Sequence, residues 1–518
     1  MNVLLTLTYL SAVRGYTWPS PQLDALETVR FNQEGFNAGG LAALIQPCTA
    51  YIFGGPNTGR SDAADWIRTA YHDMATYNKS DGTGGMDASI RFIEEQERPE
   101  NAGNGFDNTV IAMNSQINRY VSIADSLALA AIVAIENCGG PEIAFRGGRS
   151  DAGEPNAPGV PLPEQSLETH IAAFARQGFT PTEMIGLVAC GHTFGGVQHD
   201  AFPDIVGELD DPTSIDDVAH FDSTFVTFDN AIATEYISGT TRSPLIVGAN
   251  DTTNSDKQIF SSDGNTTILS FATSAEVYTS TCADLFARML DTVPAGVELT
   301  EVITPLPIKP SSVEFVMNQD TMELSGQVRL WNTTEDPSLI VQLQWSDHLG
   351  ETHTTGPLGF LGTSSSTGGK YSAVWYTFNS SSIHLDPAAG VRSLSFLING
   401  VLEDQNGLGF AVQDAFMISS TSCQIENPPS GRIDVAVRNG VNVTRLYLEE
   451  MTTDNVGRPI VVELDITPPA SPVAANPAYT VWSMNLTDPN ALYGIGAQIG
   501  GVNYSTTDQH RFVEFEVC

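Results

Sequence analysis

The sequence predicts a mainly helical domain followed by an all-β domain, and three observations support this fold class. Up to about Met289 the apolar residues recur with helical spacing, as in residues 123–131. Between Thr292 and Ser311 proline and glycine become frequent, which is typical of a stiff connecting segment. From Val313 onward short runs alternate between apolar and polar residues, as expected for strands with one buried face.

These changes in pattern divide the chain of 518 residues, a length that normally forms two or three domains. We expect a helical domain at residues 16–295, a proline-rich linker at 296–311 and a sandwich-like β domain at 312–518. Pro428 and Pro429 leave open a second division of the β domain, although a single sandwich of Greek-key type fits equally well. The predicted strands cover residues 322–330, 339–345, 373–378, 393–397, 433–437, 460–464 and 512–517.

Composition and charge limit the partners and the compartment of the protein. The formal net charge of −38 disfavours nucleic acid and anionic membrane surfaces, because like charges repel. An apolar run from Val3 to Val13, followed by Gly15, predicts a signal peptide at residues 1–15, and no later run is long enough to span a bilayer. An even number of cysteines and several Asn-x-Ser/Thr sites favour a secreted, disulfide-bonded glycoprotein. These sites are at Asn78, Asn250, Asn265, Asn332, Asn379, Asn442, Asn485 and Asn503.

A first candidate site lies in the segment Arg68-Thr69-Ala70-Tyr71-His72-Asp73. Its helical pattern places Arg68 and His72 four residues apart on one face, so both side chains project toward one point. A cation and a base would then share one pocket.

A second histidine, His192, follows a strongly patterned helix at residues 183–191. Residues 180–183 form a capping box with proline at the first helical position, which fixes the start of that helix. Such a rigid helix is suited to hold an axial metal ligand. Cys190 is excluded as a thiolate ligand at the same point, because it lies two residues before His192 and faces another side of the helix.

Either histidine alone is more often a hydrogen-bonded core residue than a ligand, but the two segments together carry a resemblance. They resemble the haem peroxidases of plants, fungi and bacteria over about residues 40–295, and the accessory residues are most similar to the secreted fungal branch. The resemblance implies a mainly α haem-peroxidase domain that holds haem b between the two histidines. It also implies hydrogen peroxide as the oxidant.

The resemblance assigns roles on the distal side of the haem. His72 would be the base that moves the peroxide proton, and Arg68 would stabilise the charge that develops as the O–O bond breaks. Asn101 would orient His72 and be held in turn by Glu95; Asn104 remains an alternative to Asn101. Tyr71 replaces the phenylalanine or tryptophan that the family usually places over the porphyrin.

On the proximal side the resemblance implies that His192 binds iron and donates its other ring N–H to a carboxylate. The segment Ser261-Ser262-Asp263 matches the family pattern for that partner, so Asp263 is expected on His192. Phe221 stands where intracellular relatives have a radical-forming tryptophan. This favours the secreted branch and a porphyrin-centred radical.

The resemblance also implies two calcium ions, which require several oxygen ligands in a tight loop. The distal ligands would be Asp73, the Gly85 carbonyl, Asp87 and Ser89. The proximal ligands would be Thr193, Asp222, Thr224, the Thr227 carbonyl and Asp229. Either cluster alone would be read as solvated loop acids.

The expected donors are small phenols or other aromatic molecules that dock at the haem edge, where the carbonyl of Pro161 resembles the family's acceptor. Leu187 stands where lignin and versatile peroxidases carry a surface tryptophan. The three positions of a manganese site hold Ser61, Asp65 and Phe194, with one acid only. The sequence therefore predicts neither a manganese site nor the tryptophan route.

Three roles remain open for the β domain: contact with cell-wall polymer or polysaccharide, a spacer, or a cover over the haem domain. By analogy with the fungal family the disulfides would pair Cys48 with Cys138, Cys190 with Cys282 and Cys423 with Cys518. We expect a monomeric, secreted haem peroxidase. The rival hypotheses are an intracellular peroxidase of the cytochrome c or catalase-peroxidase type, and an inactive peroxidase-like adhesion or cell-wall protein.

Overall fold

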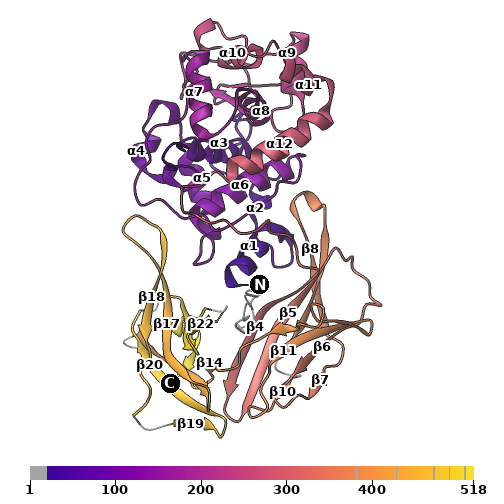
Figure 1. Ribbon diagram of the computed structural model, residues 1–518, viewed down its shortest axis with the longest axis vertical. Coiled ribbons are helices and arrows are strands. Elements are labelled where there is room, and N and C mark those ends of the chain that lie inside the picture. Colours follow the sequence, from indigo (N-terminus) through magenta and orange to yellow (C-terminus); the bar gives the residue numbers. More distant parts are fainter. Residues whose placement is uncertain (1–19, 380–382, 427–428, 471–472, 489, 507–508) are drawn as a thin grey trace, which may run out of the picture.

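The computed structural model describes residues 20–379, 383–426, 429–470, 473–488, 490–506 and 509–518. The predicted signal peptide, residues 1–15, lies outside these ranges. Figure 1 shows a helical domain at one end of the molecule and two β lobes at the other. The mainly α and all-β fold classes are both confirmed.

A nearly fully buried helix lies at the centre of the helical domain. α6 is apolar on every side, with alanines that allow close approach, and residues 123–135 are buried. α3, which carries Arg68 and His72, packs against it. The helices are α1 (Pro21–Phe31), α2 (Leu41–Leu44), α3 (Asp62–Met74), α4 (Ile93–Gln96), α5 (Gly105–Met113), α6 (Ile123–Asn137), α7 (Leu167–Gln177), α8 (Pro181–Gly191), α9 (Ala231–Ser238), α10 (Ser255–Ser261), α11 (Thr266–Thr273) and α12 (Ala275–Leu290).

The two helices that carry the candidate histidines have well-defined starts. The Ser61 hydroxyl accepts a hydrogen bond from the Ala64 N–H at the start of α3. At the start of α8 the predicted capping box is present, because Thr180 and Glu183 bond each other's backbone N–H groups. These caps fix the two helix ends on which the pocket depends.

The β region contains two hydrophobic cores that share one long sheet. In the described residues a 12-stranded sheet packs on a 5-stranded sheet in one lobe and on a 4-stranded sheet in the other. Phe396 is buried in the first core, and Leu448 in the second. Three short strands come from the helical domain. β1 (Glu34–Gly35) joins the long sheet, and β2 (Gly196–Gln198) pairs with β3 (Val218–His220). The other strands are β4 (Ile308–Asn318), β5 (Thr321–Trp331), β6 (Val341–Ser346), β7 (Thr352–Thr354), β8 (Gly359–Ser365), β9 (Ser372–Phe378), β10 (His384–Leu385), β11 (Ser393–Ile398), β12 (Val401–Glu403), β13 (Phe410–Ala411), β14 (Phe416–Ser419), β15 (Cys423–Glu426), β16 (Pro429–Arg438), β17 (Val443–Thr453), β18 (Pro459–Asp465), β19 (Val473–Asn476), β20 (Tyr479–Leu486), β21 (Tyr493–Ile499), β22 (Val502–Ser505) and β23 (Glu516–Val517).

The structure differs from two of the sequence predictions in this region. The predicted strand at 512–517 is a 3-10 turn at Phe512–Glu514 followed by the two-residue strand β23. The predicted linker at residues 296–311 overlaps the first residues of β4, which begins at Ile308. Before that point the Thr300 and Ile303 N–H groups donate to Gly147 and Phe145 carbonyls of the helical domain.

A buried ion network joins the helical and β domains. Glu27 of α1 accepts from Lys309 of β4 at 2.6 Å and from Arg329 of β5, and the three side chains are fully buried. β1 also pairs with β8 across the boundary, with Glu34 opposite Ser365. The β domain is therefore built onto the first helix of the helical domain.

All three predicted disulfides are present: Cys48 with Cys138, Cys190 with Cys282 and Cys423 with Cys518. The second ties α8 to α12, directly beside the helix end that carries His192. Among the described residues, no helix has the length and apolar character needed to cross a membrane.

Candidate active site

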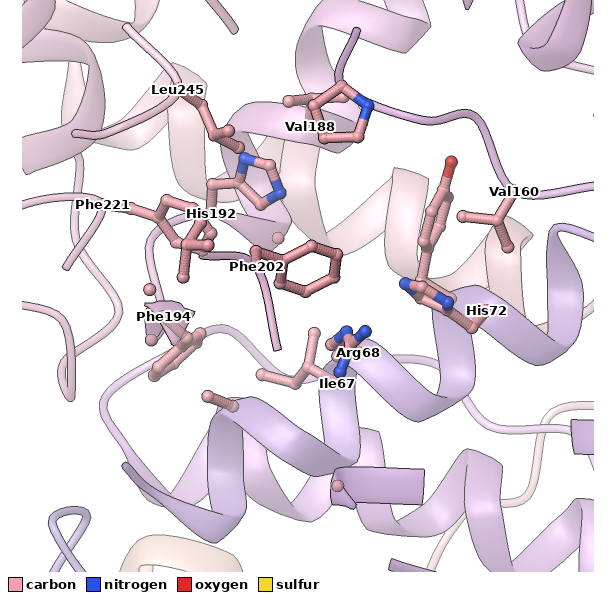
Figure 2. A pocket seen from close by; sticks show the side chains of 18 of the residues that line it. Ile67, Arg68, His72, Val160, Val188, His192, Phe194, Phe202, Phe221 and Leu245 are labelled. Carbon is pink, nitrogen blue, oxygen red and sulfur yellow. The ribbon is translucent and has the colours of Figure 1, made fainter. Parts of the chain in front are cut away.

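A cavity lies between α3 and the end of α8, with His72 and Arg68 on one side and His192 on the other (Figure 2). Most of its wall between these groups is apolar. The apolar lining includes Ile67, Val160, Leu187, Val188, Phe194, Phe202, Phe221, Leu245, Ile259 and Met289. The sequence-predicted pair of histidines is therefore brought together in one pocket.

His72 is held in one orientation by a chain of hydrogen bonds. Its Nδ1 lies 2.7 Å from Oδ1 of Asn101, and Nδ2 of Asn101 donates to the backbone carbonyl of Glu95 at 2.7 Å. Asn101 is thus the orienting residue, and Glu95 holds it through the main chain, with its carboxylate directed elsewhere. Asn104 accepts from Arg60 instead. Among the described residues the other ring nitrogen of His72 has no hydrogen-bond partner.

The electrostatic environment keeps His72 neutral. Burial and the neighbouring Arg68 charge lower the pKa of His72 well below its ordinary value. Burial also lowers the pKa of the Arg68 guanidinium to about 10, so that group stays charged near neutral pH. Arg68 donates to the Ala102 carbonyl at 3.1 Å and lies over the Phe106 ring at 4.4 Å. A neutral base and a fixed cation therefore face the same space.

On the opposite side His192 is anchored by Asp256. The His192 Nδ1 lies 2.7 Å from Oδ2 of Asp256, whose side chain is 1% exposed. The ring stacks on Phe221 with centroids 4.2 Å apart. Among the described residues the second ring nitrogen of His192 has no partner, and Figure 2 shows the ring directed into the cavity.

The prediction that Asp263 is the partner of His192 is wrong. Asp263 follows the end of α10 and accepts hydrogen bonds from the N–H groups of Thr266 and Thr267, in the first turn of α11. Its carboxylate is used as a helix cap. The signal for Asp256 was its place three and four residues before the buried Ile259 and Phe260, on the core side of a short helix.

Aromatic and apolar groups form the edge of the cavity nearest His72. Tyr71 stacks on Phe174 with centroids 6.1 Å apart, and burial raises the pKa of its phenol. Pro161 also lines the cavity, together with Val160. Pro161, the position predicted for aromatic donors, thus lines the same cavity as His72.

The residues fit a bound haem. Two imidazoles face one apolar cavity, each fixed through Nδ1 and each with its second nitrogen free of protein partners in the described chain. His192, with a carboxylate on its other nitrogen, has the arrangement of a metal-ligating histidine. The apolar walls suit a flat macrocycle, and Arg68 and His72 remain on the opposite face for chemistry.

The predicted proximal calcium ligands fit a cation. Oδ2 of Asp222 is buried without a hydrogen-bond partner in the described residues, and burial raises the pKa of this carboxyl to about 7. Thr224 bonds both Asp222 and Asp229, and Thr193 donates to the Asp229 carbonyl at 2.8 Å. Thr227 closes the same turn by donating to the Thr224 carbonyl. An unpaired buried carboxylate oxygen beside these oxygens is what a hard cation requires.

The predicted distal calcium ligands do not fit a cation as they are placed. Both carboxylate oxygens of Asp73 accept hydrogen bonds from backbone N–H groups, which belong to Asp87, Ala88 and Ile90. Asp87 and Ser89 are contacted by the side-chain nitrogen of Asn156, a residue that the sequence analysis did not identify. Burial raises the pKa of both Asp73 and Asp87.

The residues at the positions of a manganese site and of a surface tryptophan have structural roles in this protein. Ser61 caps α3, and Phe194 is buried in the core. Asp65 is not a solvated residue, because it pairs with Arg60 at 2.8 Å. Leu187 is 4% exposed and lines the cavity, so this position does not lie on the surface.

Comparison with known proteins agrees with this geometry. Residues 52–280 match the family model described as Peroxidase. The chain is 37% identical to a WSC domain-containing protein of Arthroderma benhamiae, over 64% of this chain and 46% of that protein. It is 36% identical to L-ascorbate peroxidase 5, peroxisomal, of Arabidopsis thaliana, over 26% of this chain and 48% of the relative. It is 35% identical to mitochondrial cytochrome c peroxidase of Cryptococcus neoformans, over 23% of this chain and 33% of the relative.

The chain spans about half or less of the length of these relatives, so their activities and partners are not carried over as findings. The residues that match the family model nevertheless include both His72 and His192. The helical domain of this chain therefore belongs to the haem peroxidase superfamily.

Proposed function

We propose that the protein is a secreted haem peroxidase that uses hydrogen peroxide to oxidise small phenolic or other aromatic donors at the haem edge. One observation carries the proposal: His72 and His192 face a single apolar cavity, one held by Asn101 and the other by Asp256. In each ring Nδ1 is fixed by a side chain, and the second nitrogen has no hydrogen-bond partner among the described residues, so it is left for chemistry.

Arg68, His72, His192 and Asp256 each have a task in peroxide cleavage. Haem, when bound, supplies the two electrons that cleave the O–O bond and later recovers them one at a time from donor molecules. His72 removes the proton from one peroxide oxygen and returns it to the other, which leaves as water. Arg68 stabilises the negative charge on the departing oxygen. His192 holds the iron, and Asp256 increases the donor strength of its imidazole.

The cavity edge favours small donors. Pro161 and Val160 lie at this edge, and Tyr71 with Phe174 adds an aromatic surface. An aromatic donor can stack there, within reach of the haem edge. The positions of a manganese site and of the surface tryptophan are occupied by capping, paired or buried residues, which supports direct oxidation at the edge.

Secretion is part of the proposal. The three disulfides are of a kind that persists in oxidising compartments, and the predicted glycosylation sites point the same way. We include a proximal calcium ion, since the Asp222 carboxylate lacks a partner in the described residues. The β domain would contact cell-wall polymer, in line with the sites for glycosylation and with the similarity to a WSC domain-containing protein.

Two alternatives remain from the sequence. An intracellular peroxidase is disfavoured by Phe221 in place of a tryptophan and by the disulfides, although the relatives compared include ascorbate and cytochrome c peroxidases. An inactive adhesion or cell-wall protein is disfavoured because Arg68, His72 and His192 keep the geometry that chemistry needs. A scaffold without activity has no need for a base with an unpaired nitrogen.

Turnover of the purified protein with separate donors tests the proposal. Hydrogen peroxide would be supplied with a small phenol, with ascorbate, with reduced cytochrome c or with Mn²⁺. We expect the highest kcat/KM with the phenol and no oxidation of Mn²⁺. Oxidation of cytochrome c or ascorbate alone would favour the intracellular alternative, and haem-loaded protein that oxidises no donor would favour the inactive one.

A further inference from the structure

A side-chain amide lies at the centre of the distal acidic cluster. Nδ2 of Asn156 is 3.0 Å and 2.9 Å from the two carboxylate oxygens of Asp87. The same nitrogen is 2.9 Å from Oγ of Ser89 and 3.3 Å from Oγ1 of Thr76. One NH₂ group thus faces four oxygens, including those of two residues predicted to bind calcium.

The contacts to Asp87 and Ser89 have the length of hydrogen bonds and not of metal coordination. An N–H···O bond spans about 2.7 to 3.2 Å, whereas calcium lies about 2.3 to 2.6 Å from its oxygen ligands. An ionised carboxylate only accepts hydrogen bonds, so the nitrogen end of the amide, and not its oxygen, faces Asp87. Asp73 needs no cation either, because three backbone N–H groups bond its two oxygens.

Asn156 is also connected to the distal base. Its backbone N–H donates to the carboxylate of Glu95. The carbonyl of Glu95 accepts from Asn101, which in turn holds Nδ1 of His72. A second route runs through Asp87 to Asp73, the residue that follows His72 on α3. Both routes begin at Asn156 and end at His72.

We propose that Asn156 is a positioning residue. Its carboxamide takes the place of a distal calcium ion and holds the residue in place, so that its backbone N–H fixes His72 through Glu95 and Asn101. The effect on His72 rests on the proposed peroxidase function, whereas the replacement of calcium does not. The protein would then bind one calcium ion, at the proximal site, where other oxygen ligands gather around Asp222.

Calcium stoichiometry tests the replacement without any turnover. The full-length haem-loaded protein is stripped with chelator and titrated with Ca²⁺ in a calorimeter. The wild type should bind one ion and Asp222→Ala none. In the Asp222→Ala background, Asn156→Asp adds a carboxylate among Asp87, Ser89 and Thr76 and should create one new site. Asn104→Asp is the matched control, since Asn104 bonds Arg60 outside the cluster, and it should create none.

Two wild-type calcium ions, one of which is lost in Asp87→Ala, would overturn the proposal, as would absence of a new site in folded Asn156→Asp. The wild-type measurement keeps the test decisive if that variant does not fold. Asn156→Ala should slow the reaction of the protein with peroxide about 10-fold to 100-fold, as loss of an outer-shell partner does in metal sites. Asn156→Ala should also change the pH profile of that reaction. Asn156→Asp with Ca²⁺ bound should have the wild-type rate and the wild-type pH profile. An unchanged rate and profile in Asn156→Ala would overturn the positioning role.

Discussion

Nδ1 of His192 lies 2.7 Å from Oδ2 of Asp256, and this pair joins the end of α8 to the first turn of α10. The carboxylate is buried, while the imidazole opens onto the cavity. A carboxylate in this position makes an imidazole a stronger donor and stabilises the oxidised metal. The pair therefore controls the electronic properties of any iron held by His192.

Replacement of Asp256 tests that control. Asp256→Asn removes the negative charge, so we expect a higher haem reduction potential and activity about 10-fold to 100-fold lower. Asp263→Asn is the matched control: it alters a cap of α11, with a stability loss of about 1 kcal/mol or less and no change in potential. Redox titration of both variants would distinguish them. Equal potentials in the two variants would contradict the assignment of Asp256.

Replacement of His72 tests the distal base. His72→Leu should leave haem bound, because His192 is untouched, and slow the reaction with peroxide about 100-fold to 10,000-fold. Asn101→Ala should give a smaller loss, since the base remains but its orientation is lost. Stopped-flow absorbance at several peroxide concentrations measures both rates. A near-normal rate in His72→Leu would show that another group moves the proton.

Calcium and pH should act together at Asp222. Without a cation the folded carboxyl has a pKa of about 7, whereas the unfolded one has an ordinary value near about 4. The folded state then binds the proton more tightly, so the chelated protein should lose stability as pH rises from about 4 to about 7. Bound calcium keeps Asp222 ionised and removes this loss.

The measurement is Tm with and without calcium from about pH 4 to about pH 8. The stabilisation by calcium should increase with pH and disappear in Asp222→Asn. Equal Tm values with chelator and with calcium at pH 8 would count against the proximal site.

The buried network between the domains should be costly to break. Glu27→Gln leaves Arg329 buried without an anionic partner and leaves Lys309 with Asp24 alone, and breaking a buried pair destabilises a protein by about 3 to 5 kcal/mol. Glu142→Gln is the matched control, because it breaks the exposed pair with Lys370, with an expected cost of about 0 to 1 kcal/mol. Urea denaturation gives both values. Similar small losses would show that the domains do not depend on this network.

Local patterns in the sequence predicted much of the fold and of the site. The capping box of α8 and the four-residue spacing of Arg68 and His72 depend on neighbours in the chain, so they could be read directly. The strands β5, β6, β9, β11, β16 and β18 were predicted from short runs of alternating apolar and polar residues, which are also local patterns.

The roles of Asp256 and Asn156 could not be predicted, because they depend on contacts between distant segments of the chain. Asp256 and Asp263 are both acids near a short helix, and only the path of the loop before α10 decides which one reaches His192. Asn156 lies in a loop without periodic pattern, and its role comes from Asp87 and Ser89. The alternation at 512–517 predicts a strand, but Phe512 packs on Gly431 and turns the chain away.

The absorption spectrum of the purified protein, before and after one equivalent of hydrogen peroxide, tests the central claim most directly. We expect a ferric haem band that changes within the mixing time and returns when a phenol is added. Absence of haem after expression with haem supplied, or a bound haem whose spectrum does not respond to peroxide, would contradict the assignment of His72 and His192 as the two faces of a peroxidase site.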